Sequence, residues 1–89
     1  MFQVDHYFVK FRHYKTEENE GISHVTSCEI IDDRAKILNS GYAICSILDQ
    51  FSRKIGRKIS LGRALLNAFP EDKELRRKFW ETYLNLGKN

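Results

Sequence analysis

Apolar and polar side chains alternate along the first part of this chain and predict one long strand over residues 2–15. The alternation places Tyr7, Val9 and Phe11 on one face of that strand. The other, solvated face carries Lys10, Arg12 and Tyr14. A polar, glutamate-rich stretch then predicts a hairpin loop. We therefore expect a second strand over residues 22–31 to pair antiparallel with the first.

The next part of the chain contains a short, fully apolar run. Residues 42–48 carry no charge, and their β-branched content after Gly41 favours a third strand, although a helix stays open. Residues 32–41 mix strong turn formers with a short apolar pair. They predict an excursion with one helical turn, closed by Gly41.

From residue 51 the spacing of apolar residues becomes that of a helix. A helix over 51–68 would bury a stripe made of Ile55, Ile59, Leu66 and Phe69. A second helix over 70–86 would begin at Pro70, and Gly87 would terminate it in the left-handed position that follows a helix. Its buried stripe would consist of Leu75, Phe79, Tyr83 and Leu86. The pattern predicts a single α+β domain over residues 1–89, in which an antiparallel sheet of about three strands precedes two helices.

Composition narrows the class of protein without fixing it. The 89 residues are 42% hydrophobic and 12% aromatic, which is enough for a packed core and argues against disorder. The formal net charge is +3, with cations gathered in residues 53–63 and 73–78. This balance allows a polyanionic partner but does not demand one. We see neither a run of about 20 apolar residues nor an apolar signal core, so we expect a soluble, intracellular protein without a membrane partner.

The segment from residue 49 to 65 carries most of the candidate chemistry. Phe51 could stack on a purine, or it could be an ordinary core side chain. Arg53 and Arg57 could grip phosphates, and Lys58 could act as a point charge, although charges on a helix more often face solvent. Arg63, between Gly62 and Ala64, has room around it for a ligand or a second subunit to approach.

Two further groups flank this segment. Asp49 could accept a hydrogen bond from a ligand or cap the helix, and Gln50 lies beside it. Arg76 and Arg77, near Trp80, could combine anion binding with stacking, or could offset the helix dipole beside a core tryptophan.

Catalytic and metal-binding patterns are missing from the sequence. The three histidines, His6, His13 and His24, have no Ser, Cys or carboxylate at a recognisable catalytic spacing. Cys28 and Cys45 lack a zinc-binding spacing and are expected to be buried thiols. We therefore expect no catalytic residue, no metal and no cofactor.

The run over residues 45–65, followed by Arg76-Arg-Lys-Phe-Trp-Glu-Thr-Tyr83, resembles the Thoeris anti-defence sponge family of bacteriophages. The resemblance covers about half of the chain. It implies a sheet-plus-two-helix homo-oligomer that sequesters a cyclic ADP-ribose-type signal or a cyclic oligonucleotide without cleaving it. It also implies roles for individual residues: Phe51 would stack on the base, Asp49 and Gln50 would contact ribose or base, and Arg57, Lys58 and Arg76 or Arg77 would hold phosphates.

The sequence thus predicts a non-enzymatic phage protein that captures a nucleotide signal in the host cytoplasm. An alternative is an anti-CRISPR-like inhibitor whose basic helix binds a host defence nuclease. Direct binding to DNA or RNA is a third hypothesis, and its affinity would fall steeply with salt. An enzyme ranks last.

Overall fold

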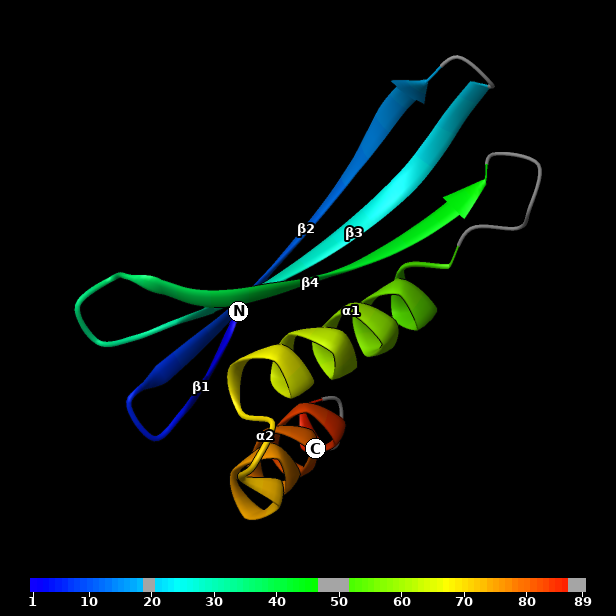
Figure 1. Cartoon of the computed structure of the whole chain (residues 1–89). Coiled ribbons are helices and arrows are strands. Elements are labelled where there is room, and N and C mark those ends of the chain that lie inside the picture. The colour runs from blue at the N-terminus through cyan, green and yellow to red at the C-terminus, as the bar shows by residue number, and fades with distance from the viewer. Residues whose placement is uncertain (19–20, 47–51, 87–89) are drawn as a thin grey trace.

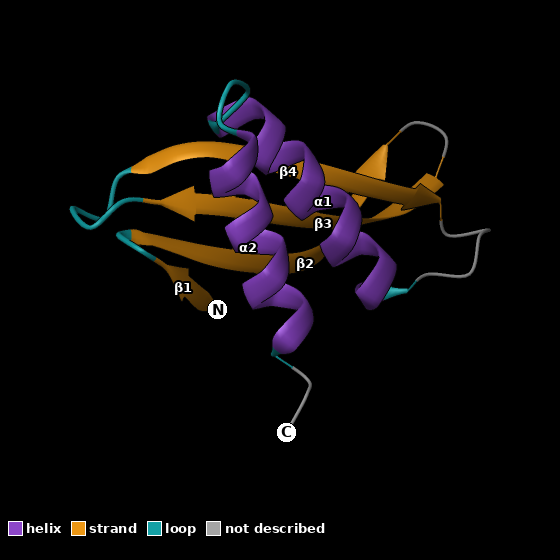
Figure 2. Cartoon of the chain, turned by 90° about the horizontal axis from the view of Figure 1, so that it is seen from below, coloured by secondary structure: helices purple, strands orange, loops and turns teal. Residues whose placement is uncertain are grey.

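The computed structural model describes residues 1–18, 21–46 and 52–86, and within them the chain forms two layers. One layer is an antiparallel sheet in the order β1-β2-β3-β4, and the other consists of two helices that lie on the same face of that sheet (Figures 1 and 2). The elements are β1 (Phe2–Val4), β2 (Tyr7–Glu18), β3 (Gly21–Ile31), β4 (Ile37–Ser46), α1 (Arg53–Ala68) and α2 (Lys73–Asn85). The predicted fold class is confirmed, with four strands in place of about three.

The additional strand arises because the predicted strand over residues 2–15 is broken by a turn. Asp5 adopts a positive φ of 52°, which a short polar side chain tolerates better than most. β1 therefore folds back on β2, and Phe2 lies opposite Val9. The two residues are buried side by side in the core.

The predicted antiparallel pairing of the next two strands is confirmed. β2 and β3 pair from Phe8 opposite Ile31 to Glu18 opposite Gly21. This register puts the odd-numbered residues of β2 and the even-numbered residues of β3 on the face that packs against the helices. Val9, which is fully buried, and Phe11, which packs against the core, confirm the predicted core face of this strand.

The connection to β4 is a tight turn, so the predicted helical turn is wrong. The Asp32 carboxylate accepts hydrogen bonds of 2.9 Å from the backbone N–H groups of both Arg34 and Lys36. These bonds close the turn early, and β4 begins at Ile37 instead of residue 42. Gly41 lies inside the strand and does not close a turn. The expected last residues of this strand, 47 and 48, lie outside the described part of the chain.

Helix α1 begins after Ser52, whose hydroxyl caps the first turn by accepting a hydrogen bond from the Ile55 N–H. The helix follows the predicted span, but it buries a different face. Three residues of the predicted stripe are exposed: Ile55 by 59%, Ile59 by 42% and Leu66 by 57%. The buried residues are instead Gly56, Ser60, Leu61, Ala64 and Leu65.

Close approach between α1 and the sheet explains this reversal. A Cβ atom on Gly41 of β4 would overlap the backbone of Ser60 and Ala64, and a Cβ on Gly56 would overlap the Thr26 side chain. Only small side chains fit at such a contact. The large apolar residues on the opposite side of α1 therefore face away from the sheet.

Helix α2 begins at Lys73, where the Asp72 carboxylate accepts a hydrogen bond of 3.0 Å from the Leu75 N–H. Pro70 lies in the preceding turn, so the predicted start of this helix is wrong. Phe79 is fully buried as predicted, and its ring stacks on that of Phe69 with 5.6 Å between the ring centroids. Leu86, which was expected to be buried, is 54% exposed. The helix ends at Asn85, one residue before the predicted end at 86, and Gly87 lies outside the described residues.

Candidate functional site

Three residues of the predicted site lie outside the described residues: Asp49, Gln50 and Phe51. The predicted cations of α1 and α2 are all within the described part of the chain.

Two of these cations lie together at the start of α1. Arg53 and Arg57 are one helical turn apart on the same side of the helix as the buried Gly56 and Ser60; Arg57 is half-buried, and Arg53, at the helix end, is exposed. His13 reaches this region from β2, and its Nδ1 lies 2.9 Å from the Thr26 hydroxyl. Burial, followed by the positive charges of Arg53 and Arg57, holds the pKa of His13 below its usual value of 6.5. We call Arg53, Arg57 and His13 the basic corner.

The basic corner is suited to an anion. Helix α1 contains five cations and no carboxylate, and its N-terminus contributes the positive end of the helix dipole. The ion pairs among residues 1–18, 21–46 and 52–86 are Arg12–Glu29, Arg77–Glu81 and Lys78–Asp5, which leaves Arg53 and Arg57 out. A lowered pKa also keeps His13 largely neutral at pH 7. The corner can thus offer two guanidinium groups to a phosphate.

The other cations of α1 lie elsewhere. Lys58 is exposed and turned by about 100° around the helix from Arg57. Arg63 donates a hydrogen bond of 2.5 Å from Nη1 to the Tyr42 carbonyl of β4. One turn later, Asn67 donates from Nδ2 to the Ser40 carbonyl at 3.2 Å. Because β4 is an edge strand, Arg63 and Asn67 cover carbonyl groups that would otherwise be open to pairing.

The α2 cations are not brought to the basic corner either. Arg76 donates hydrogen bonds of 2.6 and 2.9 Å to the carbonyls of Phe69 and Pro70, at the far end of α1. That end lies about 24 Å along the helix from Arg53, at about 1.5 Å per residue. Arg77 pairs with Glu81 at 3.2 Å in an exposed i,i+4 contact. Within one chain the predicted phosphate-binding set is therefore divided.

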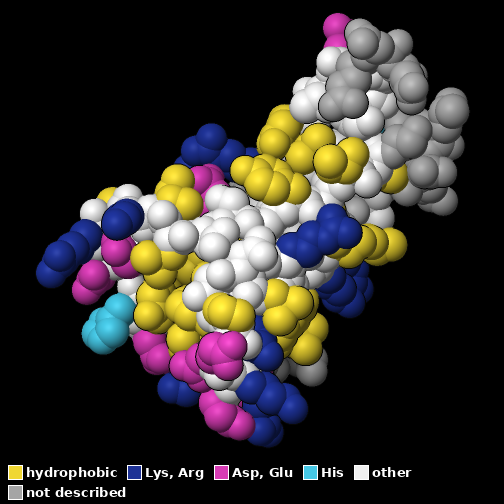
Figure 3. Space-filling model, viewed as in Figure 1, with side chains coloured by type: hydrophobic (Ala, Val, Ile, Leu, Met, Phe, Trp, Pro, Cys, Tyr) yellow, Lys and Arg dark blue, Asp and Glu magenta, His cyan; other side chains and the backbone are white. Residues whose placement is uncertain are grey.

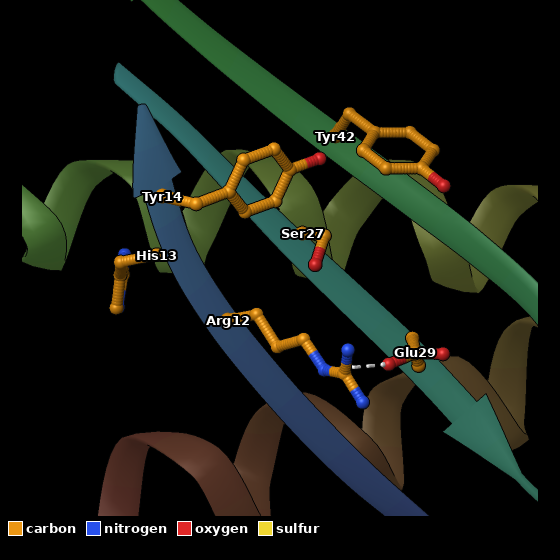
Figure 4. A pocket seen from close by; sticks show the side chains of 6 residues that line it. All are labelled: Arg12, His13, Tyr14, Ser27, Glu29 and Tyr42. Atoms are coloured by element: carbon orange, nitrogen blue, oxygen red, sulfur yellow. Dashed lines mark ion pairs between the residues drawn. The ribbon is translucent and has the colours of Figure 1, made fainter. Parts of the chain in front are cut away.

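A second concave feature, not predicted from the sequence, lies on the face of the sheet away from the helices. It is a shallow hollow of about 640 Å³. Figure 4 shows its lining, Arg12, His13, Tyr14, Ser27, Glu29 and Tyr42, with the His13 side chain turned away from the others. Arg12 and Glu29 form an ion pair at 3.4 Å across β2 and β3. The alternation along β4, which puts Tyr42 on this face, was the sequence signal that could have indicated it.

Other kinds of site are not found in the described part of the chain. Among residues 1–18, 21–46 and 52–86, no group of three or more His, Cys, Asp or Glu side chains could hold a metal ion. Neither described helix is long and apolar enough to cross a membrane. Cys28 is fully buried, and burial raises the pKa of its thiol to about 12. Such a thiol is unreactive as a nucleophile.

Comparisons with protein-family models, with curated proteins and with solved structures gave no match to this chain. The function must therefore be argued from the residues and their geometry.

Proposed function

We propose that this protein is a phage anti-defence protein that captures a cyclic nucleotide immune signal in the host cytoplasm and does not cleave it. The ligand would be of the cyclic ADP-ribose type or a cyclic oligonucleotide, held by a homo-oligomer. The observation that carries this proposal is the basic corner, where Arg53 and Arg57 lie beside His13 at the start of α1. The segment containing Asp49, Gln50 and Phe51 directly precedes it in the sequence.

The chemistry of the corner supports a phosphate ligand. A guanidinium group forms paired, charge-assisted hydrogen bonds with phosphate oxygens, and two guanidinium groups one turn apart can bind adjacent oxygens or adjacent phosphates. The helix N-terminus adds a favourable dipole for the same charge. An aromatic ring at Phe51 would supply the base contact that the resemblance assigns to it.

The geometry also reduces the number of residues proposed to bind phosphate. Arg63 and Arg76 already donate to backbone carbonyls, and Arg77 pairs with a glutamate. We therefore propose Arg53 and Arg57 as the phosphate-binding residues of each chain.

Isothermal titration with cyclic ADP-ribose isomers and cyclic di- and trinucleotides tests the proposal. We expect one of these ligands to bind at a fixed stoichiometry and to be recovered intact after heat denaturation. Arg57→Ala should weaken binding at least tenfold, since it removes a charge-assisted contact worth about 1.5 kcal/mol or more. Arg77→Ala removes the same charge from an exposed position on α2 and should leave binding unchanged. If no ligand of the panel binds, or if both variants lose affinity equally, the proposal is wrong.

One observation favours the alternative function, a protein inhibitor of a host defence nuclease. The exposed side of α1 carries Ile55, Ile59 and Leu66, and the cations Lys54 and Lys58 lie beside this stripe. An apolar stripe with a basic border is the kind of helix face that binds an acidic protein groove. A cleavage assay with a purified CRISPR nuclease tests it: the protein should block cleavage, and Ile59→Asp should abolish the block whereas Arg53→Ala should not.

A further inference from the structure

The outer face of β4 is more apolar than the face that packs against the helices. The register with β3 directs four small or polar residues toward the helices: Asn39, Gly41, Ala43 and Cys45. The residues in between point outward: Leu38, Ser40, Tyr42 and Ile44. Leu38, Tyr42 and Ile44 are 40%, 49% and 70% exposed. A solvated strand face is normally polar, so this distribution is the reverse of the usual one.

The apolar surface continues across the neighbouring strands. Val25 of β3 pairs with Tyr14 on one side and with Ile44 on the other, which makes a row of apolar side chains across three strands. The adjacent row, with Ser27 at its centre, contains the hollow described above. We call these two rows, together with Leu38, the open sheet face. Figure 3 shows hydrophobic side chains on the surface over the upper half of the sheet as well as over the helices.

This face also has little net charge. On this face Arg12 is paired with Glu29, and Lys10, which lies opposite Glu29 in the register, adds one further cation, whereas the five cations of α1 belong to the other layer. A second copy of this basic protein would therefore meet little repulsion here. An acidic partner would find its complement on α1 instead.

The β4 edge of the sheet is partly closed to strand pairing. Arg63 and Asn67 donate hydrogen bonds to the carbonyls of Tyr42 and Ser40 on this strand. At the opposite edge β1 pairs only with Tyr7–Val9, so the rest of the 12-residue strand β2 has no neighbouring strand there among the described residues. Edge-to-edge extension is thus disfavoured at β4, and the outer edge of β2 is the competing route of association.

We propose that two copies of this chain pack their open sheet faces together as a symmetric dimer. The same face carries a protruding side chain, Ile44, and a hollow of about 640 Å³, as a self-complementary two-fold interface requires. Three strands of 10 to 12 residues span about 35 by 14 Å, so two such faces bury about 1,000 Å² or more. That area reaches the lower bound for a specific interface.

The test is the mass in solution, measured by light scattering and sedimentation over a range of concentrations. Wild-type protein should have twice the chain mass of 10.5 kDa. Ile44→Glu should raise the dissociation constant at least about thirtyfold, as loss of an interface hot spot does. Leu66→Glu is the matched control, because Leu66 is 57% exposed on the outer side of α1, and it should leave the dimer intact.

Circular dichroism of both variants checks that the fold is kept, as expected for residues already exposed in one chain. The proposal is overturned if the wild-type protein is monomeric at every concentration up to about 100 µM. It is also overturned if the dimer survives Ile44→Glu or dissociates with Leu66→Glu. The proposal does not rest on nucleotide capture, because the basic corner lies in the layer that contains α1 and a dimer could form without any nucleotide. A failed nucleotide titration therefore leaves the dimer standing, whereas a monomeric mass would also remove the homo-oligomer from the proposed function.

Discussion

The contact between Gly41 and α1 allows a sharp prediction about stability. An alanine Cβ at this position would overlap the backbone atoms Ser60 O and Ala64 N. Backbone cannot rotate out of the way as a side chain can, so the whole helix would have to move off β4. We expect Gly41→Ala to destabilise the protein by about 1–3 kcal/mol or more, the range measured for overpacked cores.

The effect should be visible as a loss of thermal stability. For a domain of this size, 1 kcal/mol corresponds to about 4–8 °C in melting temperature, so we expect a fall of roughly 5–20 °C. Thermal melts followed by circular dichroism measure it. All variants must be compared at one protein concentration, because self-association makes the melting temperature depend on concentration.

Gly62→Ala provides the matched control for this prediction. A Cβ at Gly62 would meet only Trp80 Cζ2, at an ordinary contact distance of 3.5 Å. Because alanine is favoured over glycine inside a helix by about 0.5–1 kcal/mol, this variant should be neutral or slightly more stable. If Gly41→Ala melts within about 2 °C of wild type, or if both variants lose stability equally, the close packing of α1 on β4 is refuted.

Three further predictions follow from single contacts. Arg76→Ala should cost about 1–3 kcal/mol in chemical denaturation, because it leaves two carbonyls without their charged donor, whereas Arg77→Ala should change stability by less than about 0.5 kcal/mol. Arg57→Ala should raise the pKa of His13 in an NMR titration; in wild type that pKa is lowered by folding, so stability should fall as pH drops through 6.5. The buried Cys28 thiol should react with a disulfide reagent only after unfolding, which a mass spectrum of the labelled peptide shows.

The sequence was sufficient for the fold class because periodicity is a local property. A strand and a helix appear where the period-two pattern and the helical spacing predict them, although the predicted strand over 2–15 is broken by the turn at Asp5 and runs on to Glu18. What periodicity could not decide was which face of an element is buried. On α1 the three large apolar residues Ile55, Ile59 and Leu66 predicted a core stripe, but the core side of this helix is set by how closely it approaches β4.

The candidate site shows the same limit. Arg53, Arg57, Arg63 and Arg76 look equivalent in the sequence, and two of them turn out to donate to backbone carbonyls. Those hydrogen bonds join residues that are 21 and 7 positions apart in the sequence, so no local pattern predicts them. The grouping of His13 with Arg53 and Arg57 likewise depends on the packing of β2 against α1.

The side-chain cover that Arg63 and Asn67 place on β4 has a consequence for how the chain folds. β4 precedes α1 in the sequence, but the side chains that donate hydrogen bonds to its carbonyls, Arg63 and Asn67, reach it only when α1 packs against the sheet. Until that moment a newly paired sheet exposes a bare strand edge, which is the form most prone to join other chains. Refolding from denaturant should therefore lose more protein to aggregation as the protein concentration rises.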